Sequence, residues 1–223
     1  MQKRKIIIGT YDTALHGLWT LTAWNLSRAE ANEEYASVPG HGPLDLSTAL
    51  TDGEPFYGSR EFEATFESSE GSRMEREERI SQMINTLDGW RFNIILPDDA
   101  SHYISGRIRV ERLYNTLVQA SVRIGATCDP WRYNQEETRV VLTATNTEKT
   151  VSLTNNGRLS VIPSIKITGG SATLKFSANG ETRTWNLSAG EYILADIYLK
   201  TGVSPLSYSG TAGITITYRE AVL

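Results

Sequence analysis

The second half of the chain alternates short β-rich segments with glycine and asparagine turns, and this pattern restricts the fold more than any other feature. It begins after residues 134–138, which are polar and have no periodicity. The pair Asn179–Gly180 lies between two short apolar segments, which is a strong hairpin signal. Regular short strands joined by such turns are typical of a β-sandwich. We expect strands at residues 139–144, 150–154, 159–167, 172–176, 183–187, 192–199 and 213–218.

The first half of the chain combines strand patterns with one helix. Ser72 and Glu75 have the spacing of a capping box, which satisfies the free amides at a helix start, and Gly89 is the expected stop. An apolar stripe at helical spacing lies between them, formed by Ile80, Met83, Ile84 and Leu87. The sequence therefore predicts a mainly β fold with one short amphipathic helix at residues 73–88, in a domain over residues 1–133, followed by a β-sandwich over residues 134–223.

A loop rich in proline and glycine precedes a strand with one apolar face and one face expected to be exposed to solvent. Residues 38–47 contain Pro39, which fixes φ, and Gly40 and Gly42, which accept positive φ. Apolar and polar residues then alternate, with Phe62, Ala64 and Phe66 on one side and Glu61, Glu63, Thr65 and Glu67 on the other. On residue types alone this is an ordinary long loop before a hairpin. A segment built to contact another chain is the alternative.

Charge and hydropathy exclude several classes of protein. The chain has 22 basic and 26 acidic side chains, a net charge of -4 and no sustained basic run. Recognition of nucleic acid through phosphate neutralisation is therefore not expected. No stretch is long enough for a signal-peptide core or a membrane span, so we expect a soluble protein that does not insert into a membrane.

Residues that carry chemistry are few and scattered. The single cysteine, Cys128, excludes an intramolecular disulfide and a multi-cysteine metal site, and its apolar context indicates a small buried residue. His16, His41 and His102 have no metal-site spacing. Neither a nucleophile elbow nor a phosphate-binding loop is present. We expect no catalytic residue, metal or cofactor.

An acidic hydrolase is the one enzyme class that the residues suggest at all. Glu61, Glu63 and Glu67 share a strand face and could supply an acid pair. A glycosidase, however, needs one carboxyl with a pKa raised by burial, in a cleft lined by aromatic residues. A row of glutamates on a solvent-exposed strand face provides neither the buried carboxyl nor the aromatic cleft, so this hypothesis ranks last.

Several motifs, in order along the chain, resemble those of the distal tail proteins of long-tailed bacteriophages and prophages. Residues 38–47 read Val-Pro-Gly-His-Gly-Pro-Leu-Asp-Leu-Ser, and residues 57–60 read Tyr-Gly-Ser-Arg. The segments at residues 87–92, 96–99 and 128–133 resemble the helix–strand–hairpin core and the Cys-x-Pro ending of the same family. The chain departs from the family pattern at His41, where a basic residue and an extra position are common.

The resemblance implies a split-barrel-like, ring-forming domain over residues 1–133 and a galectin-like or carbohydrate-module-like sandwich over residues 134–223. It implies a non-enzymatic ring, most often of six copies, that joins the tail tube to the tail-tip hub and lets DNA pass without binding it specifically. The further partners that it implies are a receptor-binding protein or a host saccharide. Such a protein is made in the host cytoplasm and resides at the virion tail tip.

The resemblance also directs the choice of contact residues. We expect contacts with a neighbouring copy or the tail tube at Val38, Pro39, Gly40, His41, Gly42, Leu44, Asp45, Tyr57, Arg60, Phe62 and Phe66. We expect Glu61, Glu63 and Glu67 to face the channel, where a negative wall would repel passing DNA.

A stand-alone lectin-like module is the alternative from another class. It would use the sandwich to bind cell-wall sugars as a monomer or dimer, through strand aromatics such as Trp185 and Tyr192. Strand aromatics are more often core residues, and this alternative leaves the loop at residues 38–47 unexplained.

Overall fold

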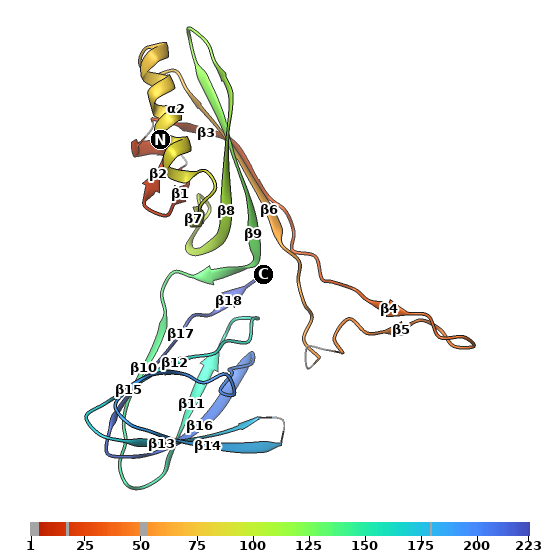
Figure 1. The fold of residues 1–223 in the computed structure, drawn as a ribbon, viewed down its shortest axis with the longest axis vertical. Helices are drawn as coiled ribbons and strands as arrows, with labels where there is room; N and C mark the ends of the chain where they lie inside the picture. The colour runs from red at the N-terminus through yellow and green to blue at the C-terminus, as the bar shows by residue number, and fades with distance from the viewer. Residues whose placement is uncertain (1–4, 17, 50–52, 179) are drawn as a thin grey trace. The chain divides into compact units, whose positions relative to one another are not determined.

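A computed structural model describes residues 5–16, 18–49, 53–178 and 180–223, and it is mainly β (Figure 1). The chain divides into two compact units, Met1–Arg132 (unit 1) and Tyr133–Leu223 (unit 2). Each unit has a hydrophobic core of its own. The mainly β fold expected from the sequence is confirmed.

Unit 1 is built on one sheet with the strand order β2-β1-β7-β8-β9-β6-β3. The pairs β1–β2, β1–β7, β7–β8, β6–β9 and β3–β6 are all antiparallel. The strands are β1 (Ile7–Ile8), β2 (Tyr11–Asp12), β3 (Thr20–Leu26), β6 (Arg60–Ser68), β7 (Arg91–Leu96), β8 (Asp99–Asn115) and β9 (Ala120–Asn134).

Helix α2 (Arg73–Leu87) confirms the helix that the sequence predicts. Ser72 caps it, with both bonds of the capping box present, and Gly89 follows the C-cap with a φ of +77°. The helix buries Ile80, Met83 and Leu87 in the core of unit 1. A second helix, α1 (Thr13–His16), was not expected, because four residues are too few for helical periodicity to be visible.

One face of β6 lies in this core, as the alternation predicts. Phe62 and Phe66 have no exposed surface, and Ala64 has 1%. They pack with Ile94, Ile108 and other apolar residues of β7, β8, β9 and α2. Burying an aromatic side chain of this kind contributes roughly 1.5–3 kcal/mol, so these residues anchor β6 in the core.

A buried arginine joins the start of α2 to the turn between β8 and β9. Arg76 is 1% exposed, and one guanidinium nitrogen donates to the main-chain oxygens of Thr116 (2.9 Å) and Leu117 (3.0 Å). Another donates to the oxygen of Gly71. Hydrogen bonds from a charged donor are stronger than neutral ones, so the β8–β9 turn has a fixed position on the helix.

Unit 2 is the β-sandwich that the sequence predicts. One sheet has the order β10-β17-β12-β15 and the other β11-β16-β13-β14. Leu153, Leu174 and Leu206 from one sheet share a core with Ile165 and Ile214 from the other. The strands of the two sheets are β10 (Thr138–Thr143), β11 (Lys149–Asn155), β12 (Ser164–Thr168), β13 (Ala172–Ala178), β14 (Glu181–Leu187), β15 (Gly190–Ile193), β16 (Gly202–Gly210) and β17 (Gly213–Tyr218). The short strand β18 (Ala221–Val222) belongs to neither sheet.

Several details of unit 2 differ from the expectation. The strands expected at residues 159–167 and 192–199 are shorter in the structure, where β12 begins at Ser164 and β15 ends at Ile193. Strand β16 was missed, because it contains Pro205 and several serines and glycines that mask its periodicity. Its pairing with β13 runs only as far as Leu206, so the missing amide of Pro205 leaves no gap in that ladder. Asn179 of the expected turn lies outside the described residues, but β13 and β14 pair on both sides of it.

Gly106 of β8 provides a test of the packing in unit 1. A Cβ at this position would lie 2.5 Å from Cys128 Sγ and 3.1 Å from the oxygen of Thr127. We expect Gly106→Ala to lower the free energy of unfolding by about 1–3 kcal/mol, because the strands must separate to admit the methyl group.

Gly125→Ala is the matched control in the neighbouring strand, since its Cβ would meet nothing closer than 3.8 Å. Urea denaturation followed by circular dichroism measures both variants. Equal stability of the two variants would contradict the packing described for Gly106.

Candidate functional site

The most exposed part of unit 1 is a long hairpin between β3 and β6, here called the arm (residues 27–59). Its two halves continue the β3–β6 pair, as Figure 1 shows in orange. The amides of Ser27 and Asn32 donate to the oxygens of Glu61 and Phe56, each at 2.8 Å. Further along, two short strands pair, β4 (Tyr35–Ala36) and β5 (Leu44–Asp45). Within its described residues, the arm is therefore held as a two-stranded extension at residues 27–36, 44–46 and 56–59.

The sequence-predicted loop forms the end of this arm. The amide of His41 donates to the oxygen of Val38 (3.0 Å), and Gly40 has a φ of +81°. Proline followed by a glycine with positive φ is typical of a type II turn. Val38, Pro39, Gly40, His41, Gly42, Leu44 and Asp45 are all exposed.

Three large apolar side chains of the arm are more than half exposed. The exposed fraction is 57% for Tyr35, 53% for Leu44 and 59% for Phe56. The arm is also acidic, since Arg28 is its one basic residue against Glu30, Glu33, Glu34, Asp45, Asp52 and Glu54. An exposed surface of apolar and acidic groups is typical of a contact site.

Two of the predicted site residues hold the base of the arm. Arg60 Nε donates to the oxygen of Ser27 (2.7 Å), and Arg60 Nη1 donates to that of Pro130 (3.4 Å). The ring of Tyr57 packs edge-on against Trp131, with ring centres 5.4 Å apart. Burial, and then the nearby Arg132 charge, lower the pKa of Arg60.

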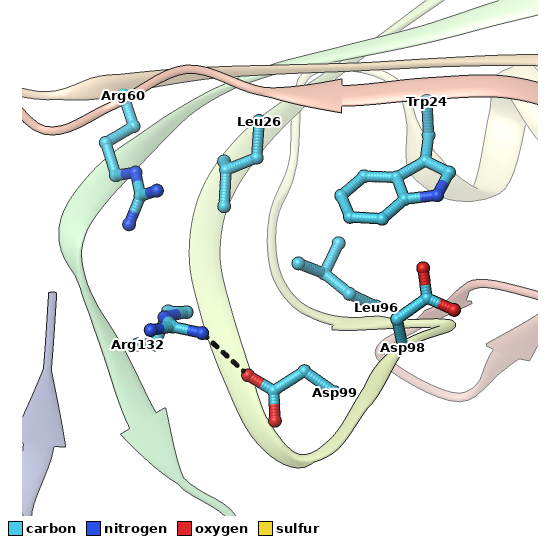
Figure 2. Close-up of a pocket in the computed structure, with 7 residues that line it drawn as sticks. All are labelled: Trp24, Leu26, Arg60, Leu96, Asp98, Asp99 and Arg132. Carbon is cyan, nitrogen blue, oxygen red and sulfur yellow. Dashed lines mark hydrogen bonds and ion pairs between the residues drawn. The ribbon is translucent and has the colours of Figure 1, made fainter.

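A cavity of about 310 Å³ lies beside the base of the arm (Figure 2). Arg60 and Arg132 lie at one end of the cavity, and the other lining residues lie opposite them or between the two ends. Arg132 pairs with Asp99 (3.1 Å), whereas Arg60 contacts main-chain oxygens. The lining residues are Trp24, Leu26, Arg60, Leu96, Asp98, Asp99 and Arg132.

Asp99, Ser101 and His102 adjoin this cavity but do not form a catalytic triad. Asp99 Oδ1 and Ser101 Oγ both contact His102 Nδ1, at 2.8 and 3.0 Å. A triad needs the serine and the carboxylate on opposite ring nitrogens, so that the histidine can take a proton from one while the other orients it. From the sequence, His102 was considered only as a metal ligand. The cluster was not predicted, because the sequence does not show that the side chains at this strand end contact one another.

Two further features bear on chemistry. Burial raises the pKa of Cys128 to about 12, so this thiol stays protonated at neutral pH. No group of three or more metal-ligating side chains occurs within residues 5–16, 18–49, 53–178 and 180–223.

The structure corrects the roles given to the two phenylalanines of β6. The side chains of Phe62 and Phe66 lie in the core with no exposed surface, so they cannot reach a neighbouring chain. The alternation that marked them as one face of a strand was correct. The helix α2 and strands β7–β9 of the same chain already cover that face.

On the opposite face of β6, two of the three glutamates have partners from neighbouring strands. Glu61 pairs with Arg109 of β8 (3.1 Å) and accepts a hydrogen bond from Thr127 of β9 (2.9 Å). Glu67 accepts one from the hydroxyl of Tyr114 (3.1 Å). Neighbouring strands thus place basic and neutral donors among the glutamates, and Glu63 is exposed beside them.

The comparisons with known proteins agree with this architecture. No protein-family model and no curated protein sequence matches the chain. Among solved structures, the chain is similar to the crystal structure of the SPP1 Dit protein, described as a paradigm of the hub adsorption apparatus in phages that infect Gram-positive bacteria.

The two structures align with a TM-score of 0.68 and 14% sequence identity, over 98% of this chain and 99% of the other. The expected resemblance to distal tail proteins is confirmed at the level of the fold. In the part of the chain that the structure describes, no helix is long and apolar enough to cross a membrane.

The exposure of the arm predicts where a protease cuts first. A two-stranded ladder without a core opens locally at low cost. In dilute protein we expect chymotrypsin to cut first after Tyr35 or Phe56, identified by mass spectrometry of a time course. The fragments should elute together in size exclusion, because β3 and β6 stay in the sheet.

Leu117 is the internal comparison for this experiment, since it is 84% exposed but lies in the turn fixed by Arg76. First cleavage at Leu117 would contradict the description of the arm as the part that opens most easily.

The Asp99 cluster predicts a pH-dependent contribution to stability. Burial alone would raise the pKa of Asp99, but hydrogen bonds from His102 and Ser101, with the charges of His102 and Arg132, lower it overall. A lowered pKa stabilises the folded state above the unfolded value of about 3.9. That stability is lost as the pH falls through the folded pKa.

We therefore expect Asp99→Asn to unfold at lower urea concentration than the wild type at pH 7. The difference should shrink below about pH 4, as measured by urea denaturation at a series of pH values. A constant difference across that range would show that the carboxylate charge is not what stabilises the cluster.

Proposed function

We propose that this chain is a structural protein of a phage tail tip, and that six copies form a ring joining the tail tube to the tail-tip hub. The observation that carries the proposal is the fold shared with SPP1 Dit over nearly the full length of both chains. A match that spans both units supports a common architecture more strongly than a match to one β-sandwich, a fold that many unrelated functions use.

The arm supports the assembly part of the proposal. Its exposed apolar side chains, among them Tyr35, Leu44 and Phe56, are in contact with solvent in a single copy. An arm on one side of a subunit and its binding site on another give a head-to-tail contact, which closes into a ring when the rotation allows. The interface would include the turn at residues 38–42, Leu44, Asp45, Tyr57 and Arg60.

The face of β6, β8 and β9 that carries Glu61, Glu63 and Glu67 is proposed to line the channel. Pairing between Glu61 and Arg109, and between Glu111 and Arg123, leaves weaker fields than a row of free carboxylates. Such a polar and nearly neutral surface would let DNA pass without binding it specifically.

Unit 2 is proposed to dock the receptor-binding machinery. Trp185 and Tyr192 are half-buried and pack against its core, which leaves less of each ring for stacking on a sugar. This observation favours a protein partner over a host saccharide.

The direct test is the oligomeric state of the purified chain. We expect light scattering to give six times the 24.8 kDa monomer mass, and negative-stain images of the same sample to show rings with a central hole. A monomer that binds cell-wall glycan would overturn the ring and favour a lectin-like module.

A further inference from the structure

The cavity beside the arm contains a positive charge without a counter-ion. Within the described residues, the guanidinium of Arg60 donates only to the oxygens of Ser27 and Pro130, and no carboxylate lies within ion-pair distance. The neighbouring Arg132, by contrast, pairs with Asp99. A half-buried charge in this situation gains most from an arriving carboxylate, since main-chain oxygens compensate it only partly.

The same cavity has an apolar side. Trp24, Leu26 and Leu96 line it between and opposite the arginines, as Figure 2 shows. A volume of about 310 Å³ is at the small end of ligand sites. It therefore suits one ring and one carboxylate held close together.

One face of the arm carries an aromatic ring and a carboxylate close together. Tyr35 of β4 and Asp45 of β5 are directly opposite each other in the antiparallel pair, so their side chains point to the same side. Tyr35 is 57% exposed, and Asp45 is exposed as well. The amide of Ser47 donates to Asp45 Oδ1 (2.9 Å), which holds the carboxylate in a defined orientation.

The arm of a chain does not reach its own cavity. The arm starts at Ser27, directly after the cavity residue Leu26, and Tyr35 lies eight residues further along. In an extended chain this spans up to about 26 Å. Folding back would break the ladder bonds of Asn32, Leu46 and Gly58. The acidic arm and the uncompensated arginine therefore complement each other between two copies.

We propose that the Tyr35–Asp45 face of one copy's arm binds in the Trp24–Arg60 cavity of the next copy. Asp45 pairs with Arg60, and the ring of Tyr35 packs on Trp24 and Leu26. This inference rests on the proposed ring, and it names the two surfaces that form each contact.

Site-specific disulfide trapping tests the contact even where it is weak. One full-length variant carries Ser37→Cys, an exposed arm position two residues after Tyr35 that leaves Asp45 in place, and the other carries Asp98→Cys at the cavity. The natural Cys128 is buried and does not interfere. Under mild oxidation we expect a covalent dimer when the two variants are mixed, and at least tenfold less when either is oxidised alone.

Asn85→Cys, on an exposed part of α2, replaces Asp98→Cys in the matched control mixture. A dimer yield equal to that control would overturn the proposal. Adding Arg60→Glu to the cavity variant should abolish the cross-link, and adding Tyr35→Ala to the arm variant should reduce it. An unchanged yield with Arg60→Glu would also overturn the proposal.

The two proposals fail in distinguishable ways. Rings without the cross-link would reject the arm–cavity contact and leave the ring in place. A specific cross-link in a protein that forms no rings would keep the contact and reject the ring.

Discussion

The pairing of β3 with β6 is the interaction on which unit 1 and its arm both depend. Its inner end belongs to the core, where Phe62 and Phe66 of β6 are fully buried. Its outer end continues into the arm through the bonds of Asn32 with Phe56 and of Gly58 with Glu30, and the antiparallel pair β4–β5 lies further along. The core therefore fixes the register of a hairpin that has almost no core of its own. Isolated two-stranded hairpins are at best marginally stable in water, so the sheet supplies the order that the arm lacks.

The same register sets the chemistry of the exposed face. Because β9 lies beside β6 with Thr65 opposite Arg123 and Glu61 opposite Thr127, no residue of β9 directly opposite a glutamate of β6 is acidic. Glu61 then contacts Arg109 from β8, the next strand but one. A surface with compensated charges interacts weakly with a polyanion over distances longer than a Debye length. This property follows from strand order, which no single strand reveals.

Local patterns in the sequence predicted those features that depend on neighbouring residues. The capping box at Ser72, the stop at Gly89 and the alternation around Phe62 all appear in the structure as expected. Features that depend on distant residues were predicted less well. The sequence identified the buried face of β6 but not what covers it. It therefore placed Phe62 and Phe66 in an interface, and it could not show that Arg109 would lie beside Glu61.

The candidate site shows the same difference between features that depend on neighbouring residues and features that depend on distant ones. The turn at Pro39 and Gly40 was visible in the sequence, whereas the cross-strand pair of Tyr35 and Asp45 was not, because ten residues separate them. The cavity combines Trp24, Arg60, Leu96 and Arg132, which come from four different strands or strand ends. Strand β16 was missed for a local reason, since Pro205 and its serines hide the alternation that buries Leu206 and Tyr208.

The continuity of the arm with β3 and β6 also has a mechanical consequence. A pull on the arm acts along the axes of these two strands, and β6 is paired along its whole length with β9 on one side and from Phe62 to Glu67 with β3 on the other. Force in this direction loads many hydrogen bonds at once in shear, instead of opening them one after another from an end. The attachment of the arm should therefore resist tension far better than its own few contacts would suggest, and under load the arm would give way before the sheet that holds it.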